Sequence, residues 1–140
     1  MLRKNIFALV ISVVPLLLLT ACQTTADGTD DGVKRVSYAT LLSENQLNIL
    51  KISPGQTKQQ VMDIMGSSQA QLKSTFITNP YKQIFFSVEK VDYEILYYLT
   101  RRYPAFTTIK ESQATPIVLK NGNVVGLGTE AVQKAKRGGL

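Results

Sequence analysis

The stretch Tyr-Glu-Ile-Leu-Tyr-Tyr-Leu-Thr, residues 93–100, decides the fold of this chain. Successive side chains of a β-strand point to opposite faces, so this stretch presents two rows of side chains. One row is Tyr93, Ile95, Tyr97 and Leu99, and the other is Glu94, Leu96, Tyr98 and Thr100. The alternation predicts a β-strand around which the other elements are arranged.

Three further strands are predicted beside this one. Residues 81–88 alternate in the same way after an Asn-Pro turn signal. Residues 115–119 and 124–127 flank a turn that contains Asn121 and Gly122. Asn-Gly is the strongest short hairpin signal, because both central positions of that turn need a positive φ. Four strands in hairpin order predict an antiparallel β-meander.

Two short helices are predicted before the strands. Ser43 with Gln46, and Thr57 with Gln60, have the capping-box spacing in which the first side chain accepts from a backbone amide and the second reaches back. The second helix then carries the apolar stripe Val61, Ile64 and Met65. Gly66 is placed to end it in a left-handed conformation.

Helices that precede a run of strands indicate an α+β fold. We therefore predict two short N-terminal helices packed on a small antiparallel β-sheet meander. Residues 130–136 could form a last turn of helix or no regular structure, and residues 36–42 carry enough apolar groups to dock on the domain.

The start of the chain has the pattern of an export signal. Arg3 and Lys4 precede an apolar run over residues 6–19, which is too short to span a bilayer as a permanent helix. The run closes on Leu-Thr-Ala-Cys, which resembles the bacterial lipobox and implies that Cys22 is lipidated; an ordinary cleavable signal is the alternative. The predicted parts are a signal peptide (1–21), a flexible tether (22–35) and a folded domain (36–140).

The composition narrows the possible chemistry. The chain has no histidine, which excludes histidine-based triads and histidine metal sites, and its single cysteine excludes an internal disulfide. The formal net charge of +6 is spread along the chain, and an envelope location argues against a nucleic-acid partner. We expect no catalytic residue, no metal and no cofactor.

Residues 52–66 resemble the signature of the SmpA/OmlA outer-membrane lipoproteins, the small accessory family of the β-barrel assembly machine. The matching residues are Gly55, Thr57, Gln60, Val61, Met65 and Gly66. The resemblance implies two helices on a small antiparallel sheet, a lipid anchor in the outer membrane with the domain facing the periplasm, and envelope proteins as partners. In the enterobacterial sorting pattern of lipoproteins, aspartate after the lipidated cysteine retains the protein in the inner membrane. By resemblance to that pattern, Gln23 implies transfer to the outer membrane.

A candidate partner surface follows from the strand faces. If the helices cover the row that begins with Tyr93, then Phe85, Leu96, Tyr98 and Val118 tend toward the other face, and an exposed aromatic patch often marks a protein interface. The alternative is a second small core, covered by the chain termini or by residues 36–42.

The predicted function is that of a non-catalytic protein-binding or scaffolding lipoprotein. An inhibitor or ligand-binding module, or a structural component of an envelope secretion apparatus, is the alternative.

Overall fold

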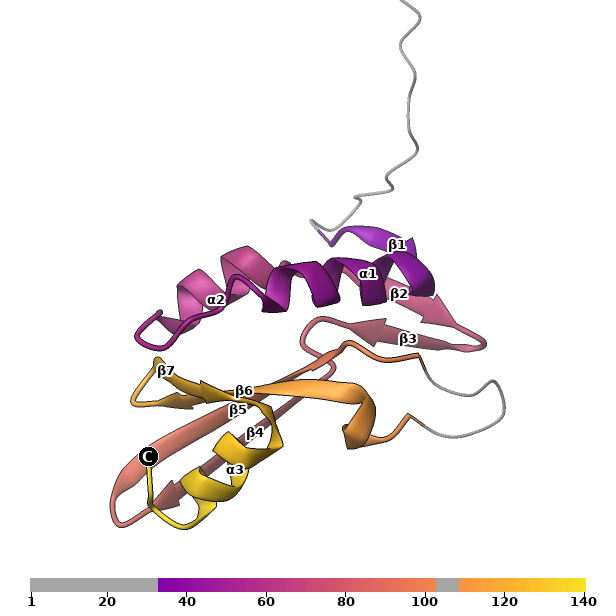
Figure 1. Ribbon diagram of the computed structural model, residues 1–140. Helices are drawn as coiled ribbons and strands as arrows, with labels where there is room; N and C mark the ends of the chain where they lie inside the picture. The colour runs from indigo at the N-terminus through magenta and orange to yellow at the C-terminus, as the bar shows by residue number, and fades with distance from the viewer. Residues whose placement is uncertain (1–32, 103–108) are drawn as a thin grey trace, which may run out of the picture.

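The computed structural model describes residues 33–102 and 109–140 (Figure 1). The predicted signal peptide, Cys22 and the tether as far as residue 32 lie outside these residues. The elements in chain order are β1 (Arg35–Ser37), α1 (Tyr38–Ile49), α2 (Lys58–Met65), β2 (Gln69–Leu72), β3 (Thr75–Thr78), β4 (Lys82–Val88), β5 (Val91–Leu99), a 3-10 turn (Glu111–Gln113), β6 (Ala114–Lys120), β7 (Asn123–Leu127) and α3 (Gly128–Lys136). Among them, no helix is long and apolar enough to cross a membrane.

The four-stranded sheet is the antiparallel meander that the alternation predicts. Its strand order is β4-β5-β6-β7, and Ile95 of β5 lies opposite Ile84 of β4 and Val118 of β6. Asn121 and Gly122 join β6 to β7 with φ angles of 47° and 81°. Both angles are positive, as the Asn-Gly hairpin signal requires. The α+β fold class is confirmed.

A second sheet was not predicted. β1 pairs in parallel with β2, and β2 pairs antiparallel with β3. The prediction of a single sheet is therefore wrong, because β1 has three residues and β2 reads Gln-Ala-Gln-Leu, too short and too polar for an alternation signal. Arg35, at the end of the predicted tether, already belongs to this sheet.

The first helix starts earlier than its capping box indicates. Ser37 is the N-cap of α1, and its Oγ accepts from the backbone N–H of Thr40 at 3.1 Å. Ser43 lies inside the helix, so its assignment as a cap is wrong. The buried residues Leu41 and Leu42 explain the difference, because they draw one more turn of helix onto the core.

The second helix begins as predicted. The Thr57 Oγ1 accepts from the backbone N–H of Gln60 at 3.2 Å, and the Gln60 Oε1 accepts from the backbone N–H of Thr57 at 2.8 Å. Gly66 follows α2 with φ 70° and ψ 171°. Its φ is positive as expected, but its ψ is extended rather than helical, and this region is accessible essentially to glycine alone.

Helices cover both faces of the four-stranded sheet: α1 and α2 lie on one side and α3 on the other (Figure 1). The core on the α2 side consists of Ile52, Val61, Met65, Leu96, Tyr98, Ile117, Leu119 and Val124. The core on the α3 side consists of Tyr93, Ile95, Tyr97, Val118, Ala131, Val132 and Ala135. A third cluster joins α1, the small sheet and the end of β5 through Leu41, Leu42, Ala70, Ile77 and Leu99. The terminal segment, which the sequence left open, thus forms a helix that completes a second core.

Candidate protein interface

The structure separates the four residues predicted to form a partner surface. Leu96 and Tyr98 are 0% exposed and pack against α2, and Val118 is 0% exposed on the α3 side. Phe85 is 66% exposed. The prediction that the first three lie on an open surface is wrong: α2 covers the row with Leu96 and Tyr98, and α3 covers the row that begins with Tyr93.

Phe85 is exposed because of its place at the sheet edge. It is a β4 residue opposite Glu94, on the face of the sheet that α2 covers further in. Edge strands have a neighbour on one side only, so a covering helix centred on the inner strands leaves their side chains in solvent. Phe85 is therefore a large aromatic ring held on a rigid strand at the margin of the core.

Charged and polar side chains surround the Phe85 ring. The Lys58 Nζ, at the start of α2, lies 5.6 Å from the ring centroid and 2.7 Å from the Glu94 Oε1. The Gln83 amide also donates to Glu94. A cation over an aromatic face contributes about 0.5–1 kcal/mol at an exposed site. These contacts hold the ring in place while much of it remains open to solvent.

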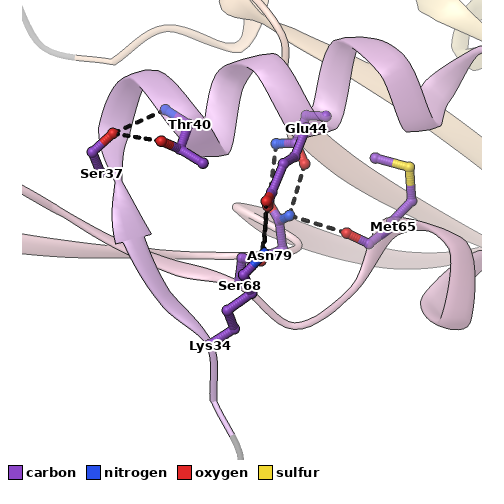
Figure 2. Close-up of polar contacts among 8 residues, drawn as sticks. Lys34, Ser37, Thr40, Glu44, Met65, Ser68 and Asn79 are labelled. Atoms are coloured by element: carbon purple, nitrogen blue, oxygen red, sulfur yellow. Dashed lines mark hydrogen bonds and ion pairs between the residues drawn. The ribbon is translucent and has the colours of Figure 1, made fainter. Parts of the chain in front are cut away.

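A buried polar network joins α1 to the entry of β4 and to the end of β5 (Figure 2). The Asn45 Nδ2 on α1 donates to the Asn79 Oδ1 at 3.1 Å and to the Leu99 carbonyl at 2.8 Å. The Asn79 Nδ2 donates back to the Asn45 Oδ1 at 2.7 Å. Because Asn79 lies shortly before β4, the network fixes the entry of β4 relative to α1. The sequence signals at these positions, a capping box and an Asn-Pro turn, gave no hint of the pairing.

The network continues to the surface beside the start of the domain. The Ser68 Oγ donates to the Glu44 Oε2 at 3.3 Å, and the Glu44 Oε1 forms an ion pair with the Lys34 Nζ at 2.8 Å (Figure 2). Glu44 therefore joins α1 both to the residue before β1 and to the loop after α2. Both contacts of Glu44 therefore serve to hold these segments together.

Other exposed apolar side chains belong to other elements. Phe76 is 59% exposed on β3 of the small sheet, beside a hollow of about 260 Å³, and Leu47 and Leu50 are exposed at the end of α1. A second hollow, of about 230 Å³, lies between Tyr97 on β5 and Lys136 on α3. Within residues 33–102 and 109–140, no three His, Cys, Asp or Glu side chains come together as metal ligands.

Tyr98 is buried in the core on the α2 side of the sheet. The Tyr98 hydroxyl donates to the Met62 Sδ at 3.5 Å, and burial raises the pKa of Tyr98 far above its usual value. Burial disfavours the charged form of the hydroxyl, so Tyr98 stays neutral inside the core. Tyr98 is a core residue.

Residues 23–134 match the family described as "Protein of unknown function (DUF3192)". The chain belongs to the DUF3192 family. No curated protein and no solved structure matches it. The DUF3192 region contains both sheets, α1 and α2, and most of α3, so the whole environment of Phe85 lies inside it.

Proposed function

We propose that this protein is a lipoprotein of the outer membrane, anchored through Cys22, which binds another envelope protein and catalyses no reaction. The proposal rests on the lipobox pattern before residue 22 and on the 66% exposed Phe85. A large aromatic side chain that stays in solvent on a well-packed strand is available to a partner, and aromatic residues are enriched at protein interfaces. Phe85 would then be the apolar centre of the interface, and Lys58 and Glu94 its polar margin.

The resemblance of residues 52–66 to the SmpA/OmlA lipoproteins supports a role beside outer-membrane protein assembly. We infer that a component of the barrel-assembly machine is the first partner to test. An inhibitor, a ligand-binding module or a part of a secretion apparatus would use the same anchored domain with a different partner.

The anchor is tested by Cys22→Ala. Labelled palmitate should enter the wild-type protein and not the variant, and the variant should leave the outer-membrane fraction. Unchanged membrane association of Cys22→Ala would contradict the anchor.

The partner surface is tested by placing a photo-reactive amino acid at position 85 in the full chain. Phe76 is a matched control, because it is also a strand phenylalanine and is 59% exposed on the other sheet. Position 85 should yield a discrete crosslinked envelope protein, and Phe85→Ser should lower its recovery from detergent-solubilised membranes. Equal crosslinking from position 76, or full recovery with Phe85→Ser, would contradict the assignment.

A further inference from the structure

The four-stranded sheet has one closed edge and one open edge. At the β7 edge the backbone N–H of Gly55 donates to the Val124 carbonyl, and the N–H of Val124 donates to the Gln56 carbonyl, both at 2.8 Å. At the other edge β4 pairs with β5, and in the described part of the chain no strand pairs with its outer side. The loop before α2 thus completes the sheet at β7, while the outer backbone groups of β4 remain available to a further strand.

The open edge lacks the features that normally prevent strand addition. Protected edges carry prolines, bulges or charged side chains in mid-strand. β4 reads Lys-Gln-Ile-Phe-Phe-Ser-Val, with no proline and with its one charge, Lys82, at the first position. Its register with β5 runs without a bulge from Lys82 to Val88. Beyond Lys82 the edge is regular and uncharged, so it can accept an antiparallel strand.

The residue types of β4 are nearly symmetric about Phe85. Ile84 and Phe86 are the apolar neighbours on its two sides, and Gln83 and Ser87 are the polar neighbours beyond them. A segment with the same order of residue types in both directions, as residues 83–87 have, is complementary to itself when two copies run antiparallel. The natural occupant of this edge is therefore a second copy of the same strand.

We propose that two copies of this protein pair through their β4 strands about a two-fold axis that passes beside Phe85. In this register Phe85 lies opposite Phe85 of the second copy, Ile84 lies opposite Phe86, and Gln83 lies opposite Ser87. The two four-stranded sheets become one continuous sheet. Over residues 83–87 apolar groups meet apolar groups and polar groups meet polar groups. At the two ends Lys82 lies opposite Val88, so no like charges face each other.

Partly buried side chains on the α3 side support the same register. Ile84, Phe86 and Val88 pack at the margin of the α3 core, but α3 itself packs on β6 and β7. The margin beside β4 therefore stays half-covered in a single copy. Pairing through β4 brings the two margins together and extends both cores across the axis.

On the opposite face the two Phe85 rings lie side by side, so the aromatic surface is enlarged and still accessible. The inference goes beyond the proposed function and does not depend on a partner protein.

Cysteine crosslinking tests the register in the full chain. Cys22 is the single natural cysteine, so the wild-type chain measures the background. Opposed residues of antiparallel strands have Cα atoms about 4.5–5.5 Å apart, which suits a disulfide. Phe85→Cys should give a covalent homodimer on mild oxidation of membranes. Gln83→Cys and Ser87→Cys should each give little alone, and a covalent dimer when the two variants are co-expressed with different tags.

Leu47→Cys, an exposed position on α1, controls for random collision. We expect at least about tenfold more covalent dimer from Phe85→Cys, and from the Gln83→Cys and Ser87→Cys mixture, than from Leu47→Cys. Dimer yields no higher than that control would overturn the proposal. A disulfide from position 85 to a different protein, with no homodimer, would overturn it in favour of a partner strand.

Charge exchange gives a second, independent measurement. Phe85→Glu and Phe85→Lys should each abolish the dimer of the detergent-solubilised protein in sedimentation experiments, because like charges would face each other across the axis. Mixing the two variants should restore a dimer that contains one copy of each. Circular dichroism shows whether the variants are folded. Dimers in both single variants, or monomers alone in the mixture of folded variants, would contradict the self-opposed register.

Discussion

Asn45 and Asn79, 34 positions apart in the chain, exchange a reciprocal pair of side-chain hydrogen bonds inside the core, at 3.1 and 2.7 Å. Both are buried, so neither amide could find water if its partner were removed. The pair also engages the Leu99 and Met65 carbonyls, which lie at the ends of β5 and α2. These four hydrogen bonds together join α1, α2, the entry of β4 and the end of β5.

Removing either amide should therefore destabilise the domain. We expect Asn45→Ala and Asn79→Ala each to lower the free energy of unfolding by about 1–3 kcal/mol, because each leaves buried polar atoms of the other unpaired. The double variant should cost less than the sum of the two. Urea denaturation measures the three values. Asn48→Ala, on the same helix but partly exposed, is the control and should change stability by less than about 0.5 kcal/mol. Strict additivity of the pair would contradict the reciprocal bonding.

The capping box of α2 gives a second prediction. Thr57→Ala removes the side-chain oxygen that accepts from the Gln60 N–H, and this should cost about 1 kcal/mol. Thr78→Ala, at an exposed strand position, should cost clearly less. Thermal unfolding of both variants compares them, and equal melting temperatures would argue against the cap.

Close packing between Gly126 and Ala131 gives a third prediction. A Cβ on Gly126 would lie 2.8 Å from the Ala131 Cβ, so Gly126→Ala should push α3 from the sheet and cost about 1–3 kcal/mol. Ala131→Gly alone should cost about 0.5–1 kcal/mol, through the flexibility of glycine in a helix. The double variant should lose less stability than the sum of the two single losses, because Ala131→Gly removes the Cβ that the new Cβ at position 126 would meet. Denaturant unfolding measures this coupling, and a double variant no better than the sum would show that the clash is relieved in another way.

The buried hydroxyl of Tyr98 predicts a dependence of stability on alkaline pH. Its folded pKa is raised above the unfolded value by burial, so the neutral form is favoured in the fold. The contribution of Tyr98 to the free energy of unfolding is fully present below the ordinary tyrosine pKa of 10.0. Above that pH the contribution is lost, because the hydroxyl ionises first in the unfolded chain. Wild-type stability should fall by up to about 1.4 kcal/mol per pH unit above that point from this group. Tyr98→Phe should lack this part of the loss and differ little from wild type at pH 7. Parallel alkaline profiles of the two proteins would contradict the assignment.

Local patterns determined much of this protein. The alternation over residues 93–100, the Asn-Gly turn and the Thr57 capping box each depend on neighbours a few positions away, and each is found in the structure. Phe85 is exposed as predicted but for another reason: it lies on the face that α2 covers, and the edge position of β4 leaves it in solvent.

The features that the sequence did not predict are those that depend on contacts between distant segments. A strand with apolar groups in both rows does not say which helix covers which row, and α2 and α3 reversed the expected assignment of Leu96 and Tyr98. The short strands of the small sheet form because β1 pairs with β2, 34 positions further along the chain, and no local sequence pattern predicts that pairing. The Asn45–Asn79 contact arises in the same way. Tertiary packing decided these features, because the free energy of burial belongs to the pair of surfaces that meet and not to either segment alone.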